Sequence, residues 1–213
     1  MFKTPKTLLN ALALVIVLVS ASPALAGPPL ICIPFNTGSV RLLAWGTETS
    51  NWNAALPSYN LKALTADTLR VLDADTAVLS RMENLRRATI YAMKNPAVAE
   101  EFLKTMVGRA LSTTPTAATW FDAGYVIEAY KQAKHLRPVG SFDRAAWAAV
   151  DETLRVDGYG FVTKAIAMNG GPSPEMEYAA SLMTQGAVAS AHRSRATAAA
   201  ARGSYLAANL AKY

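Results

Sequence analysis

The stretch that decides the fold is residues 112–134, STTPTAATWFDAGYVIEAYKQAK. Residues Ser112 to Thr116, with Pro115, interrupt the preceding helix and are typical of a new helix start. The stretch then runs to Lys134 without a further proline. Its large side chains fall on more than one face of the predicted helix: Trp120, Phe121, Tyr125, Val126, Ile127 and Tyr130. A helix that is apolar on several faces is contacted from several sides. We therefore predict a central helix surrounded by other elements.

Amphipathic helices are predicted upstream of this central helix. Asn95-Pro96 is a strong start signal, because the asparagine oxygen can accept hydrogen bonds from free amides and proline suits the first helical turn. Apolar residues follow at three- and four-residue spacing: Val98, Phe102, Leu103, Met106, Val107, Ala110 and Leu111. The same spacing predicts an earlier helix that starts near Asp75 or Thr76, after a short one capped by Thr65.

Further helices are predicted after residue 134. Ser141 caps one, residues 161–168 form a second, and Ser173-Pro174 starts a last helix that has a kink at Gly186 and ends near Ala201. A further turn or two is expected past Gly203. Paired helix starts at these positions also resemble the spacing of two-helix repeats. Residues 62–213 therefore predict an all-α domain of about six helices, either an irregular bundle or a short αα-hairpin solenoid.

Residues 27–61 predict a non-helical N-terminal arm. Pro28-Pro29 favours an extended start, and the segment is rich in turn residues. Its content of aromatic residues, which includes Trp45 and Trp52, is too high for a disordered linker. We expect the arm to pack across the helices, with a short strand over 40–45.

Residues 1–26 predict a secretory signal peptide. Lys3 and Lys6 precede an apolar run from residue 8 to 19, and Ala24-Leu25-Ala26 provides the small residues of a cleavage site. The apolar run is shorter than the roughly 20 residues of a spanning helix. We therefore expect an exported protein, periplasmic or secreted, whose mature chain begins at Gly27.

The mature chain has a mild positive charge. Loss of Lys3 and Lys6 with the signal lowers the formal net charge of the chain from +6 to +4. The remaining basic residues form no dense stripe interleaved with aromatics, so a nucleic acid is not an expected partner. No second long apolar run follows, so no membrane span is expected after cleavage.

Catalytic and metal chemistry is not predicted. Cys32 is the only cysteine and has no partner within the chain, so it either packs as a small apolar residue or links to another chain or ligand. His135 falls at a predicted helix end and His192 in a basic stretch expected to be solvated. One cysteine and two distant histidines predict no metal site, and no cofactor motif is present.

Three stretches resemble known proteins. Residues 120–130 resemble the first helix of tetratricopeptide-like units, although the full tetratricopeptide consensus is absent. Together with Cys32-Ile33-Pro34-Phe35 and residues 81–88, they are similar to uncharacterised exported bacterial helical proteins. The resemblance implies a helical fold and no activity. Similar proteins often carry histidine after the cysteine, so Ile33 would remove any thiol–imidazole pairing here.

The first functional hypothesis is a non-catalytic, helical-repeat-like protein that binds another protein or peptide in the cell envelope. The alternative is an enzyme or small-molecule binder with a pocket between the arm and the helices. Asp122 is expected to be buried and to pair with Arg86 or Arg87. The oligomeric state stays open. The candidate binding residues are Trp45, Trp52, Arg86, Trp120, Asp122 and Tyr125.

Overall fold

The computed structural model describes residues 29–47, 52–73, 75–134, 136, 151 and 155–212. These residues contain helices and irregular segments but no strand, which confirms the predicted all-α class. The predicted signal peptide 1–26, His135 and the helix expected after Ser141 lie outside the described residues. The helices are α1 (Pro29–Cys32), the 3-10 turn η1 (Leu61–Ala63), α2 (Leu64–Val71), α3 (Val78–Ala92), α4 (Pro96–Ala110), α5 (Ala117–Lys134), α7 (Gly158–Met168), α8 (Pro174–Met183), α9 (Gly186–Ala199) and α10 (Tyr205–Leu210).

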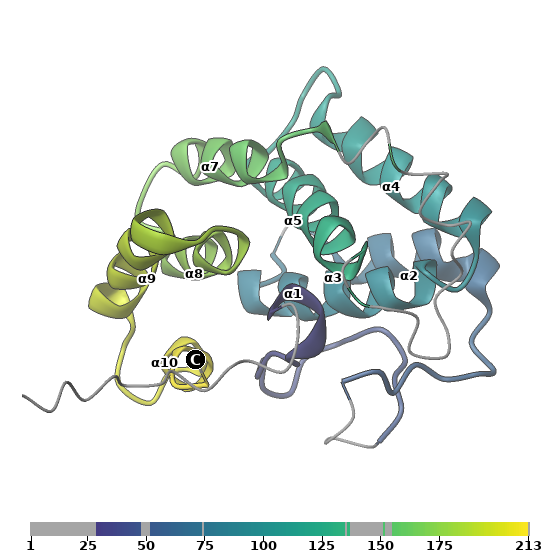
Figure 1. Cartoon of the computed structure of the whole chain (residues 1–213), viewed down its shortest axis with the longest axis horizontal. Helices are drawn as coiled ribbons and strands as arrows, with labels where there is room; N and C mark the ends of the chain where they lie inside the picture. Colours follow the sequence, from purple (N-terminus) through teal and green to yellow (C-terminus); the bar gives the residue numbers. More distant parts are fainter. Residues whose placement is uncertain are drawn as a thin grey trace, which may run out of the picture.

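Helix α5 lies at the centre of this arrangement (Figure 1). It contacts α1, α3, α4, α7 and α8, and every residue from 120 to 130 is buried. In a solenoid each repeat contacts only its neighbours. Because α5 also touches elements far from it in the chain, the fold is an irregular bundle around a central helix.

Two glycines set the close approach of α5 and α7. A Cβ atom at Gly124 would lie 2.5 Å from the carbonyl oxygen of Gly158, and one at Gly158 would lie 2.7 Å from that of Gly124. The two backbones therefore touch where the helices cross, and any side chain at either position would separate them.

The predicted caps are confirmed only in part. Thr65 does not cap α2, because it lies inside that helix after the N-cap residue Ala63, and α3 begins at Val78 rather than near Asp75 or Thr76. The Asn95 side chain accepts hydrogen bonds from the amides of Ala97 and Val98, and Asp157 accepts one from Gly160. Helix α7 therefore begins at Gly158, earlier than the Phe161 expected from the glycines. The predicted kink at Gly186, where φ is 60°, is instead a complete break between α8 and α9. Helix α10 fulfils the prediction of a further turn past Gly203.

The N-terminal arm differs from its prediction in two places. Pro29 begins a helical turn rather than an extended segment, and this turn buries Leu30 and Ile31 completely. No strand forms over 40–45. The amide of Leu43 donates to the Asn84 side chain at 2.8 Å instead of to a neighbouring strand. The rest of the described arm is irregular apart from η1, as predicted.

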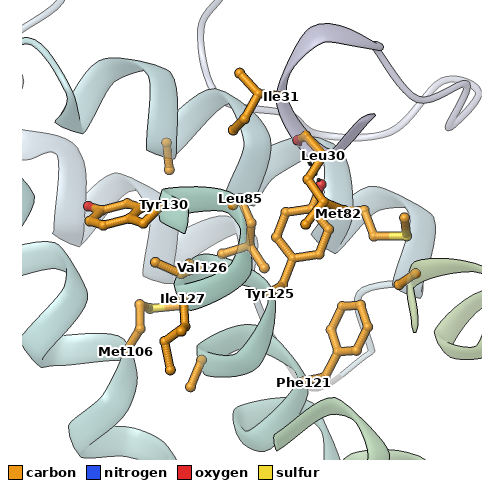
Figure 2. Close-up of a cluster of buried hydrophobic side chains, with 14 of the residues drawn as sticks. Leu30, Ile31, Met82, Leu85, Met106, Phe121, Tyr125, Val126, Ile127 and Tyr130 are labelled. Carbon is orange, nitrogen blue, oxygen red and sulfur yellow. Dashed lines mark hydrogen bonds between the residues drawn. The ribbon is translucent and has the colours of Figure 1, made fainter. Parts of the chain in front are cut away.

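The apolar core gathers around α5 (Figure 2). Leu30 and Ile31 of α1 reach it from the arm, while α3 and α4 contribute Met82, Leu85 and Met106. The α5 side chains in it are Phe121, Tyr125, Val126, Ile127 and Tyr130. None of the helices in the described ranges is long and apolar enough to cross a bilayer.

Candidate functional site

One polar face of α3 holds the arm. We call Glu83, Asn84, Arg86, Arg87 and Tyr91 the α3 clamp, because each of them hydrogen bonds to the backbone of the arm. All but Arg87 are buried. Buried polar groups are costly unless they are hydrogen bonded, and here their partners are the amides and carbonyls of a segment without regular structure. The clamp therefore replaces the backbone pairing that a strand would supply.

Glu83 is the charged centre of the clamp. Its two carboxylate oxygens accept from Arg86 Nε and Nη2, both at 2.8 Å, and from Arg87 Nε at 2.7 Å. The amide of Phe35 adds a fourth hydrogen bond at 3.0 Å. Burial alone would raise the pKa of Glu83, but the hydrogen bonds and charges of Arg86 and Arg87 outweigh it and lower that pKa.

The arginines extend from this carboxylate to the arm. Arg86 Nη1 donates to the carbonyls of Ile31 at 3.0 Å and Trp52 at 2.8 Å, so one guanidinium joins two distant parts of the arm. Arg87 Nη1 donates to the Leu43 carbonyl at 2.7 Å. The planar, multiply donating guanidinium suits this task, since it can satisfy a carboxylate and several carbonyls at once.

A cavity of about 410 Å³ lies where the arm folds back on itself. Trp45, half-buried, lines it, and the Gly46 amide donates to the Ala54 carbonyl at 2.7 Å to close the loop. The remaining lining residues are Thr47, Asn53, Ala55, Leu56 and Pro57. We call this the Trp45 cavity.

The Trp45 ring is fixed by the clamp beneath it. The guanidinium carbons of Arg86 and Arg87 lie 5.2 and 5.4 Å from the ring centroid, within range of cation–π attraction. Tyr91 meets the same ring edge-on and also donates its hydroxyl hydrogen to the Ala44 carbonyl at 2.8 Å. Tyr59 stacks on Tyr91 at a centroid distance of 4.2 Å. The indole is therefore held in one orientation at the edge of the cavity.

The predicted binding residues divide into two groups. Trp45, Trp52 and Arg86 come together at the arm and the clamp. The remaining three lie elsewhere on α5. Trp120 packs edge-on against Phe161, and Tyr125 is buried and donates its hydroxyl hydrogen to the Leu30 carbonyl. The small-molecule hypothesis requires all six side chains to line one common pocket. Of the six, only Trp45 lines the Trp45 cavity.

Asp122 is buried and paired, as predicted, but the predicted partners are wrong. Its carboxylate accepts from Arg81 Nη1 at 2.9 and 3.1 Å and from Arg109 Nη1 at 3.4 Å. Arg86 and Arg87 bind Glu83 instead. Burial raises the pKa of Asp122, whereas the two neighbouring arginines oppose that change. This cluster ties α3 and α4 to the central helix.

Cys32 is half-buried at the end of α1. Burial raises the pKa of its thiol to about 11, although the charge of Arg86 opposes this. The thiolate is the reactive form of cysteine, so this thiol is a poor nucleophile at neutral pH.

The prediction of a solvated His192 is wrong, because the side chain is only 5% exposed. Its Nε2 lies 2.8 Å from the Tyr159 hydroxyl, and its Nδ1 contacts the Glu177 carboxylate, which Arg195 also binds at 2.9 Å. The alanine-rich sequence of α9 has no apolar stripe that would mark a buried face. The cluster joins α7, α8 and α9, and we assign it a structural role.

Among the described residues, no three histidine, cysteine, aspartate or glutamate side chains converge as the ligands of a metal ion would. No protein family model, no curated protein and no solved structure matches this chain.

Proposed function

We propose that this protein is a non-catalytic, exported binding protein that holds an apolar segment of another envelope protein in the Trp45 cavity. The observation that carries the proposal is a half-buried tryptophan at the edge of a cavity of about 410 Å³. Tryptophan, with tyrosine and arginine, dominates binding energy at protein interfaces. Ala55, Leu56 and Pro57 make much of the opposite lining apolar.

The hydrogen bonds that hold the described part of the arm on α3 support the same proposal. A binding loop that is already ordered loses less conformational entropy when its partner binds. The clamp uses buried charges, among them Arg86 at 0% exposure, to order a loop that has no strand partners. A loop that served only as a linker would not need this support.

A binding role fits the polar groups near the cavity better than catalysis does. A catalytic group must be in reach of the reacting atoms and in the right protonation state. Glu83, Arg86 and Arg87 already form hydrogen bonds with each other and with the arm, so they are not free to act on a substrate. The raised pKa of Cys32, about 11, keeps the thiol protonated.

Site-specific photocrosslinking tests the proposal in the native envelope fraction. A photoreactive residue at Pro57, which is exposed on the cavity lining, should crosslink one discrete partner protein. The matched control is Leu111, which is 62% exposed at the end of α4 and should give no such product. Ala55→Trp, which fills the cavity, should abolish the Pro57 crosslink. Equal products from both positions, or a crosslink that survives Ala55→Trp, would contradict the proposal.

A further inference from the structure

Helix α9 is held to the bundle by few side chains. It packs against α8 (Figure 1), yet only His192 and Ala196 among its 14 residues are buried. Nearly every residue of α3, by contrast, is buried. Because an alanine side chain buries little apolar area, hydrophobic contact contributes little to the attachment of α9. The attachment therefore depends largely on the polar contacts of His192.

These contacts join three helices. His192 Nε2 lies 2.8 Å from the hydroxyl of Tyr159 on α7, and Nδ1 contacts the carboxylate of Glu177 on α8. Arg195, one turn further along α9, reaches the same two groups. Its Nε donates to Glu177 at 2.9 Å, and its Nη2 lies 2.6 Å from His192 Nδ1. We call Tyr159, Glu177, His192 and Arg195 the His192 cluster.

His192 Nδ1 has two neighbours with opposite requirements. A carboxylate accepts hydrogen bonds, whereas a guanidinium only donates them. In a neutral ring with its proton on Nε2, Nδ1 accepts from Arg195, and the guanidinium bridges the ring and Glu177. In a charged ring, the Nδ1 proton is donated to Glu177, and Arg195 Nη2 then faces a donor that is also positive. The two contacts of Nδ1 are therefore hydrogen bonds in different protonation states.

Other charged side chains of the three helices are directed elsewhere. On α7, Lys164 lies over the Trp120 ring at 3.6 Å from its centroid, and Asp157 accepts from the amide at the start of its own helix. On α9, Arg193 donates to a backbone carbonyl of α10 at 2.6 Å. Glu175 precedes Glu177 by two residues and so projects from a different side of α8. The charge of the ring is therefore set against Glu177 and Arg195.

We propose that His192 makes the attachment of α9 dependent on pH. With a neutral ring, Arg195 bridges His192 and Glu177, and α9 is docked on α8. Histidine changes its charge between pH 5 and 8. A charged ring, only 5% exposed, competes with Arg195 for one carboxylate, and the Arg195 side chain, 52% exposed, moves into water. Helix α9 then loosens, independently of the Trp45 cavity and of the partner protein proposed there.

Hydrogen exchange of the 15N-labelled protein, followed by NMR at pH 8 and pH 5, tests this dependence. Protection factors correct for the effect of pH on the intrinsic exchange rate. The amides of residues 190–199 should lose protection at least about tenfold at pH 5, because local opening exposes them. The amides of residues 100–110 on α4 should keep theirs. Equal losses on both helices would mean general acid destabilisation, and either this result or unchanged protection of α9 would overturn the proposal.

The two histidines of the chain provide a matched pair of variants. His192→Gln has a side-chain oxygen that accepts from Arg195 but takes up no proton in this range, so it should remove the loss of protection between pH 8 and pH 5. His135→Gln should lose α9 protection as the wild type does. A loss that persists in His192→Gln, or that disappears in His135→Gln, would assign the pH dependence to another group and refute the proposal.

Arg195 is tested by a second pair of variants with equal changes in charge. Arg195→Gln removes the cation that competes with the charged ring for Glu177, so the loss of α9 protection at pH 5 should shrink. Arg202→Gln, at an exposed position after α9, is the control and should lose protection as the wild type does. Equal losses in Arg195→Gln and Arg202→Gln would contradict the competition for Glu177.

Discussion

At the scale of single residues, buried charged side chains of α3 supply the hydrogen bonds to the arm backbone that a neighbouring strand would otherwise supply. Glu83 is 1% exposed and accepts four hydrogen bonds, three of them from arginines. Removing one member of a buried ion pair leaves the others uncompensated, which costs more than the pair itself contributes. The clamp should therefore be much more sensitive to substitution than the ion pairs on the surface.

Glu83→Gln tests this sensitivity. The amide has no charge for Arg86 and Arg87, and its NH2 group would face their donors, so we expect the free energy of unfolding to fall by about 3–5 kcal/mol. Urea denaturation measures it. The matched control is Glu100→Gln on α4, where an exposed i,i+4 pair with Lys104 is lost. That change should stay within about 0.5 kcal/mol. Equal losses in the two variants would contradict the role of the clamp.

The loss of unfolding free energy caused by Glu83→Gln should depend on pH. The pKa of Glu83 is lowered in the folded protein, so its charge stabilises the fold above the unfolded glutamate pKa of about 4.3. This contribution is lost as the pH falls through the lower folded pKa. The difference in unfolding free energy between wild type and Glu83→Gln should therefore shrink from neutral pH towards pH 3 or below. A constant difference over that range would show that Glu83 does not titrate as described.

Cys32 gives a second test at this scale. Because burial raises its pKa to about 11, alkylation by iodoacetamide should be slow at neutral pH and should accelerate up to that pH. In urea, where the burial is lost, the reaction should follow an ordinary cysteine pKa of about 8.5. Mass spectrometry of the alkylated protein measures both profiles. Coincident profiles in the folded and unfolded protein would contradict the raised pKa.

The sequence predicts that Asp122 is buried, but it does not identify the arginine that binds this carboxylate. Its position among aromatic residues of a central helix implies burial, and a buried carboxylate needs a cation. The choice between Arg81 and Arg86 depends on how α3 is rotated about its axis. The two residues project about 140° apart on a helix, so only the packing of α3 on α5 decides between them. Arg81 faces α5, and Arg86 faces the arm.

At the scale of helices and loops, local signals predict some helix starts but not all, since Pro29 begins a helical turn and Thr65 does not cap α2. Asn95-Pro96 and Ser173-Pro174 both mark helix starts, because proline suits the first helical turn. Asn95 also caps its helix, whereas the Ser173 side chain forms no cap hydrogen bond. The strand expected over 40–45 fails because a strand needs a partner from elsewhere in the chain. Here the partner is the side chain of Asn84 on α3, 41 residues away from Leu43, and no local pattern encodes it.

The close approach of α5 and α7 can be tested by adding one methyl group at Gly124. Gly124→Ala would place a Cβ 2.5 Å from the Gly158 carbonyl oxygen, so the helices must separate. We expect a loss of about 1–3 kcal/mol in the free energy of unfolding, measured by urea denaturation. Gly108→Ala on α4 is the matched control, since nothing lies within 4 Å of its added Cβ. It should stabilise the protein by about 0.5–1 kcal/mol, because alanine favours the helix. Stabilisation by Gly124→Ala would contradict the close crossing.

At the scale of the whole molecule, the arm is attached on two sides. The α3 clamp holds one side, and α10 holds the other. Asn209 accepts from the Asn36 amide at 2.8 Å and donates back to the Asn36 carbonyl at 2.7 Å, while Lys212 donates to the Pro34 carbonyl at 2.7 Å. The end of the Tyr205 ring lies against Gly38, where a Cβ atom would displace the ring and where a φ of 70° favours glycine. The arm therefore links the central bundle to the last helix.

These two attachments should open separately. Asn209→Ala removes both bonds to Asn36, each of about 1 kcal/mol, so the Asn36 amide should exchange its hydrogen at least about tenfold faster. The Leu43 amide should keep its protection, because Asn84 of the clamp still accepts its hydrogen bond. Hydrogen exchange followed by NMR measures both amides in one experiment. Asn169→Ala, which removes only an exposed contact to the Gly171 carbonyl, should change neither rate. Equal acceleration at Asn36 and Leu43 would mean that the arm opens as one unit, with α10 rather than the clamp controlling it.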